Sequence, residues 1–78
     1  MSYSYWKLTV SDRYGTNHIV FGAENAMKSV VDDMRKAIVD NKPRFLEAKG
    51  HTETPDRAEV ILTILTEDVV AMSVVRIT

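Results

Sequence analysis

The chain has 78 residues, with ten Lys and Arg, eleven Asp and Glu, a formal net charge of -1 and no cysteine. This length excludes a two-domain enzyme, and the lack of cysteine excludes disulfides, cysteine-ligated metals and a thiol nucleophile. The charge balance argues against the overall positive field of most nucleic-acid binders, and we expect one domain over residues 1–78 without cofactor or metal.

The N-terminal part of the chain has the pattern of a β-hairpin. Residues 3–11 alternate between apolar and polar side chains, a period of two that predicts a half-buried strand. Turn-forming residues follow, and residues 17–21 return to β-branched and aromatic side chains. His18 is expected on the outer face of this second strand. One face of the first strand consists of Trp6, Leu8 and Val10.

Residues 23–41 change to the period of an α-helix. Asn41 suits the cap of such a helix, and Pro43 prevents its continuation. Charged residues occupy the opposite side, so the apolar stripe is predicted to pack on the sheet. The stripe consists of Met27, Val30, Val31, Met34 and Ile38.

The C-terminal half returns to strands. Residues 44–49 suggest a short strand, and residues 50–56 form a polar loop that contains glycine and proline. Residues 58–65 alternate, with one wholly apolar face and one partly apolar face, which favours a central strand. Residues 66–72 suit one helical turn, and residues 73–77 form the last strand.

This order predicts a small α+β domain, β-β-α-β-β-β, with a mostly antiparallel sheet and one amphipathic helix packed across it. A helical turn before the last strand also occurs in small barrels. The alternative fold is therefore an SH3-like or Sm-like barrel with an inserted helix. Because the chain shows no basic leader and no run of about 18 apolar residues, we expect a cytoplasmic protein without membrane contact.

The sequence offers little for catalysis. His51, Glu53 and Asp56 share the long loop, but one histidine and two carboxylates without a known spacing make a weak metal site. His18 lies near Asp12 across the first turn, without a nucleophile elbow or a glycine-rich loop. We therefore predict no catalytic residue and no bound metal.

Cations and an aromatic residue gather around the third strand and the loop after it. This loop is longer than a hairpin requires, and surplus loop on a rigid scaffold often carries binding residues. Acidic residues between the cations cancel much of their field, which favours a protein partner over RNA or DNA. The predicted binding residues are Arg44, Phe45, Lys49, His51 and Arg57.

If the last strand turns Val75 and Ile77 toward the helix, several apolar side chains remain for the other face of the sheet. Exposed together, they would approach the size of an interaction patch, which a second copy could cover. A second core layer, as in a barrel, is the alternative. The predicted self-association interface consists of Tyr3, Tyr5, Ile61, Leu65 and Val74.

These features together favour a non-enzymatic protein-binding module that forms a homodimer or a larger homo-oligomer. Small cysteine-free chains of this kind include accessory proteins of phages and other mobile elements, which inhibit a host protein by surface contact. This comparison is with a class of proteins, and no single residue of the chain supports it. The alternative function is an RNA- or DNA-binding small barrel.

Overall fold

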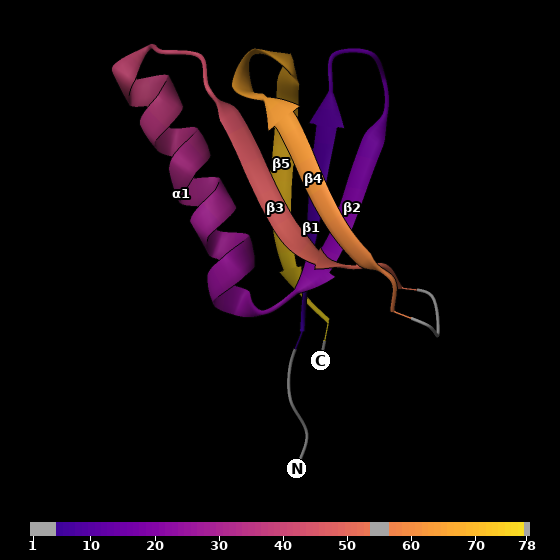
Figure 1. Cartoon of the computed structure of the whole chain (residues 1–78). Coiled ribbons are helices and arrows are strands. Elements are labelled where there is room, and N and C mark those ends of the chain that lie inside the picture. Colours follow the sequence, from indigo (N-terminus) through magenta and orange to yellow (C-terminus); the bar gives the residue numbers. More distant parts are fainter. Residues whose placement is uncertain (1–4, 54–56, 78) are drawn as a thin grey trace.

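In the part of the chain that the structure describes, five strands, one helix and one 3-10 turn follow one another in the predicted order, and Figure 1 shows their arrangement. A computed structural model describes residues 5–53 and 57–77 of the chain. The elements are β1 (Trp6–Asp12), β2 (Asn17–Gly22), α1 (Glu24–Asp40), β3 (Phe45–His51), β4 (Glu59–Leu65), the turn η1 (Thr66–Asp68) and β5 (Val69–Arg76).

The strands form one open antiparallel sheet in the order β4-β3-β2-β1-β5, with α1 packed on one side. The α+β prediction is therefore confirmed. The barrel alternative is wrong, because β4 and β5 are the two edges of the sheet and do not pair with each other. The prediction of a central strand at residues 58–65 is also wrong, because β5 returns to pair with β1 and leaves β4 at an edge.

The sheet bends sharply between β2 and β3, whose pairing consists of Phe21 opposite His51. Gly50 permits this close approach, since a Cβ there would lie 2.1 Å from the Phe21 carbonyl oxygen. In Figure 1, β3 and β4 lie in front of β1, β2 and β5, and β2 and β3 converge at their lower ends. The sheet therefore has two parts, the β3–β4 ribbon and a ribbon of β2, β1 and β5. The core lies between these two ribbons and α1.

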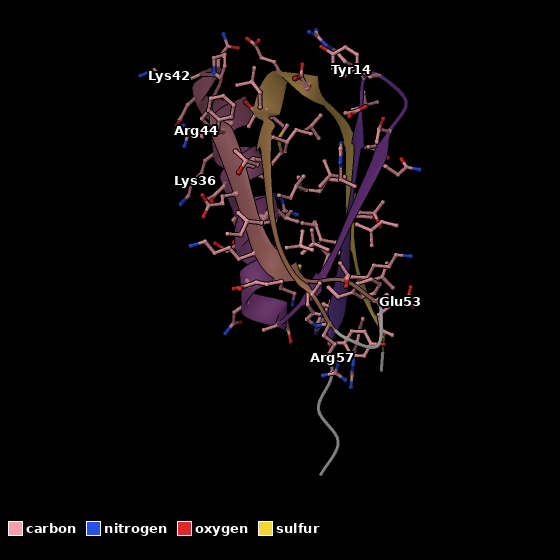
Figure 2. The ribbon with its side chains drawn as sticks, turned by 45° about the vertical axis from the view of Figure 1, so that its right-hand side comes forward. Tyr14, Lys36, Lys42, Arg44, Glu53 and Arg57 are labelled. Carbon is pink, nitrogen blue, oxygen red and sulfur yellow. The ribbon has the colours of Figure 1, made fainter. Side chains whose placement is uncertain are left out.

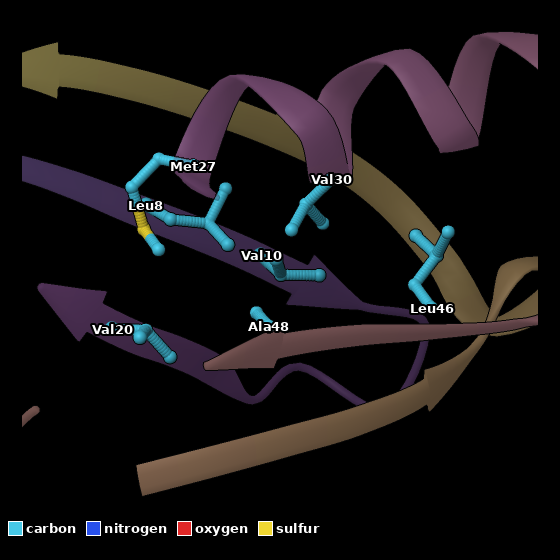
Figure 3. Packing of buried hydrophobic residues seen from close by; sticks show 7 residues of the cluster. All are labelled: Leu8, Val10, Val20, Met27, Val30, Leu46 and Ala48. Atoms are coloured by element: carbon cyan, nitrogen blue, oxygen red, sulfur yellow. The ribbon is translucent and has the colours of Figure 1, made fainter. Parts of the chain in front are cut away.

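The core collects alternate side chains of the strands and the first half of the helix (Figure 3). Leu8 and Val10, from the apolar face of the first strand, belong to the cluster, and Trp6 of the same face packs against it. Residues of β4 and β5 pack around the cluster and stay half-buried, as expected at sheet edges. The buried cluster consists of Leu8, Val10, Val20, Met27, Val30, Leu46 and Ala48.

Helix α1 buries a stripe that differs at its end from the predicted one. Met27 and Val30 are buried as expected, but Ile38 is 65% exposed and Ala37 is buried in its place. The prediction for Ile38 is therefore wrong. Because the helix crosses a twisted sheet, the side in contact rotates along its length. The predicted cap at Asn41 is confirmed by its left-handed φ of 52°.

The faces of β5 are opposite to those expected. Val74 lies opposite Leu8 of the core, whereas Val75 is on the other face and 50% exposed, and Ile77 is exposed as well. The strand is apolar on both sides, so its sequence alone does not indicate which side faces inward. Pairing with β1 decides the question, and the expectation that Val75 and Ile77 face the helix is wrong.

Candidate functional site

The outer side of the β3–β4 ribbon brings several predicted residues onto one surface, which we call the β3–β4 face. It includes three of the predicted binding residues and two of the predicted interface residues. Helix α1 packs on the opposite side of this ribbon (Figure 1). The face consists of the cross-strand pairs Phe45 and Leu65, Glu47 and Thr63, Lys49 and Ile61, and His51 and Glu59.

Two large apolar side chains dominate the accessible part of this face. Phe45 is 70% exposed beside half-buried Leu65, and Ile61 is 59% exposed further along β4. An exposed aromatic side chain flanked by aliphatic ones is typical of the anchor of a protein interface. The β3–β4 face thus offers apolar contact area on a rigid ribbon.

The cations near this face already have acidic partners. Lys49 Nζ lies 3.2 Å from Glu47 Oε1 on the same strand, and Arg44 Nη2 lies 3.1 Å from Asp40 Oδ2 at the end of α1. These exposed pairs add little stability, but each places a negative charge beside a positive one. The β3–β4 face therefore has no cation cluster aimed at a phosphate.

The five predicted binding residues do not meet at one site. Arg44 and Arg57 lie at opposite ends of the molecule (Figure 2). Arg44 comes directly before the seven-residue strand β3, and His51 is the last residue of that strand. Among the predicted binding residues, Phe45, Lys49 and His51 share the β3–β4 face, and Arg57 lines a separate small pocket with His51.

That pocket has a volume of about 90 Å³ and lies beside the bend of the sheet. Phe21 is on the outer side yet only 4% exposed, because its ring contacts those of Tyr5 and His51 at centroid distances of 5.8 and 6.2 Å. The His51 Nδ1 lies 2.8 Å from the Thr52 carbonyl oxygen. Tyr5 and His51 therefore pack the bend, and the predicted interface residue Tyr3 lies outside the described residues.

The remaining interface residues are divided between two surfaces. Ile61 and Leu65 are on the β3–β4 face, but Val74 points to the core side of β5, at the other edge of the sheet. A single flat interface of these residues does not exist in the fold. The cause is the pairing of β5 with β1, which turns Val74 toward the core.

Asp12 and His18 do meet, as their spacing suggested. His18 Nε2 lies 2.9 Å from Asp12 Oδ2, and the carboxylate also accepts the N–H groups of Tyr14 and Thr16 at 2.9 and 3.0 Å. The hydrogen bond from Thr16 and that from His18 hold the pKa of Asp12 below its ordinary value of 3.8. These bonds fix the turn between β1 and β2.

The position of His18 corrects another expectation. It pairs with Val10 and so belongs to the core side of β2, which makes the prediction of an outer position wrong. The nearby Ser11 hydroxyl donates to Asn17 Oδ1 at 2.7 Å and not to the imidazole. The arrangement lacks the nucleophile-to-base bond of a catalytic triad and serves the hairpin.

No group of three or more His, Cys, Asp and Glu side chains is arranged for a metal ion among residues 5–53 and 57–77. Asp56, a member of the weak metal candidate with His51 and Glu53, lies outside these residues. Within the same ranges, no helix is both long enough and apolar enough to cross a membrane.

Comparisons of the chain with protein-family models, curated proteins and solved structures found no match.

Proposed function

We propose that the chain is a non-enzymatic protein-binding module. It recognises a partner protein through the β3–β4 face and associates with itself through a separate surface. The observation that supports partner binding is the exposure of Phe45 and Ile61 on a ribbon whose other side forms the core. Burying such side chains against a partner releases about 25 cal/mol for each Å² of apolar area.

The charges of this face favour a protein over RNA or DNA. Nucleic-acid sites combine aromatic platforms with cations that are available to phosphates. Here Lys49 has Glu47 beside it and Arg44 has Asp40 beside it. The alternative of an RNA- or DNA-binding small barrel also requires a closed barrel, whereas the sheet is open.

The setting that we propose is the cytoplasm, where the chain would act as an accessory protein by surface contact. The small size of the chain and its lack of cysteine support this proposal, and no group of His, Cys, Asp and Glu arranged for a metal ion occurs among the described residues. An inhibitor carried by a mobile element is one such accessory role.

The test is capture of proteins from native lysate by the immobilised chain, with identification by mass spectrometry. We expect Phe45→Ala and Ile61→Ser each to weaken capture of the same protein by about tenfold or more, because interface anchors carry most of the binding energy. Tyr14→Ala is the matched control, since Tyr14 is an equally exposed aromatic residue on the β1–β2 turn.

Two outcomes contradict the proposal. Capture that persists in both variants shows that the β3–β4 face is not the binding surface. Capture that disappears after nuclease treatment, or that weakens steeply with salt, supports the nucleic-acid alternative instead.

A further inference from the structure

Strand β5 is an edge strand with little to prevent it from pairing with another strand. Among the described strands its neighbour is β1 alone. Long edge strands usually carry lysine, proline or inward-pointing charges that discourage pairing. The eight residues of β5, VVAMSVVR, contain none of these before the terminal Arg76. The register shift opposite Asp12 affects only the start of the strand and leaves its later part regular.

The hydrogen-bond pattern shows which residues of β5 face this open edge. Ile77 donates its N–H to the Tyr5 carbonyl oxygen at 3.0 Å. Because antiparallel pairs alternate between bonded and non-bonded, Ser73 and Val75 also face β1, and Met72 and Val74 direct their N–H and C=O groups away from it. Met72 and Val74 therefore present backbone donors and acceptors at the edge.

The same two residues present apolar side chains toward the helix. Met72 lies opposite Val10 and Val74 opposite Leu8, and both stay half-buried. Together with Val31 they line a groove of about 400 Å³ between α1 and β5. A strand added beside β5 would therefore place its own inward side chains next to this groove.

The helix wall of the groove does not select a charged occupant. Its charged residues are Lys28, Asp32 and Arg35. Lys28 pairs with Glu24, and Arg35 Nη1 lies 3.7 Å from Asp32 Oδ1, so the charges of the wall are matched within α1. An apolar strand suits this groove better than an acidic or a basic peptide does.

We propose that the occupant is β5 of a second copy, paired antiparallel around a two-fold axis at Ser73. In this register Met72 lies opposite Val74 of the second copy, and Val74 opposite its Met72. Both pairs join apolar side chains on the helix side, and both use the outward-facing backbone groups. The interface is thus self-complementary, as a two-fold dimer requires.

Neighbouring registers are less favourable. A shift of two residues in one direction places Met72 opposite the charged Arg76. A shift in the other direction places Val74 opposite Val70, beside the irregular start of β5. The Ser73-centred register also joins the two sheets into one of ten strands and leaves the β3–β4 face open. The inference therefore rests on the proposed self-association but not on the partner-binding face.

Ser73→Cys tests the register directly, because the chain has no other cysteine. The backbone N–H and C=O groups of Ser73 point toward β1. Ser73 and its copy therefore form a non-hydrogen-bonded pair across the two-fold axis, in which the Cα atoms lie about 4.5 Å apart. This distance suits a disulfide. We expect a covalent dimer after mild oxidation, seen on a non-reducing gel. Thr63→Cys on the other edge strand is the control and should stay monomeric.

Introducing a charge at residue 73, on the proposed two-fold axis, gives an independent test of the dimer. Ser73→Lys and Ser73→Glu should each raise the dissociation constant of the dimer by about tenfold or more, because like charges face each other across the axis. An equimolar mixture of the two variants should form a dimer again. Light scattering at micromolar concentration measures the mass, and circular dichroism shows that the fold persists.

A monomeric unmodified chain, or Ser73 variants that stay dimeric, would overturn the proposal. So would equal cross-linking through Thr63→Cys, which would indicate pairing through β4. Partner capture is scored separately for the same variants. Failure of dimerisation with capture intact removes the β5 inference and the self-association, and leaves partner binding by the β3–β4 face standing.

Discussion

Single side chains along one side of α1 differ greatly in burial. Met27 has no exposed surface, whereas Ile38, eleven residues later on the predicted stripe, is 65% exposed. We predict that Met27→Ala lowers the free energy of unfolding by about 2–5 kcal/mol through lost burial and the cavity left behind. Ile38→Ala should change it by no more than about 0.5 kcal/mol. Urea denaturation followed by circular dichroism measures both, and equal losses would show that the helix is oriented differently.

Asp12 links stability to pH. Its pKa in the folded chain is lowered from 3.8, chiefly by the N–H of Thr16 and by His18. A lowered pKa means that the carboxylate stabilises the fold above the unfolded value and that this contribution is lost as the pH falls through the folded value. We predict that unmodified protein unfolds at a higher temperature than Asp12→Asn at about pH 5, and that the gap narrows below pH 3.8. A gap that stays constant down to about pH 2 would contradict this role.

At the scale of elements, the joint between β2 and β3 depends on one residue. A Cβ at Gly50 would lie 2.1 Å from the Phe21 oxygen and 2.6 Å from Val20 Cγ1. Because the backbone must move to relieve this contact, we predict that Gly50→Ala lowers the free energy of unfolding by about 1–3 kcal/mol.

Gly22→Ala is the matched control for this joint. The nearest atom to its added Cβ would be the terminal carbon of Met27, at 3.1 Å, and a flexible methionine end can shift. The loss should therefore be smaller than at Gly50. Equal losses in chemical denaturation would show that the bend tolerates a side chain.

The elements themselves were largely predictable, because periods of two and 3.6 residues are local properties of the chain. The helix ends close to its predicted limits, and the hairpin of β1 and β2 formed as expected. The facing of Val74 and Val75 was not predictable, since β5 is apolar on both sides. The edge position of β4 depends on how distant strands pair, which no local pattern records.

The candidate site was predictable only in part, because residues that are close in sequence can lie far apart along an extended strand. Alternation placed Ile61 and Leu65 on one face of their strand, as the structure shows. Arg44 and His51 are close in sequence, but the strand between them advances about 3.3 Å for each residue and so sets them far apart. The bend that buries Phe21 against His51 left no signal beyond Gly50.

At the scale of the whole molecule, the fold leaves two surfaces with different character. The β3–β4 face exposes side chains, among them Phe45 and Ile61, whereas the β5 edge presents backbone groups beside a groove. They lie at opposite edges of the sheet order, so a dimer through β5 would carry two β3–β4 faces. Two linked faces bind a repeated partner more tightly than one face does, provided that their spacing matches.

Dimerisation through β5 also makes a prediction about stability. If two copies unfold together, their stability depends on protein concentration by mass action. A tenfold increase in concentration should raise the apparent free energy of unfolding by about 1.4 kcal/mol per dimer and shift the denaturation midpoint upward. Ser73→Lys, whose new side chain would be exposed in the monomer, should unfold at a lower midpoint that depends less on concentration. A midpoint of the unmodified chain that stays constant over a hundredfold range would mean that the small core of the monomer holds the fold without a second copy.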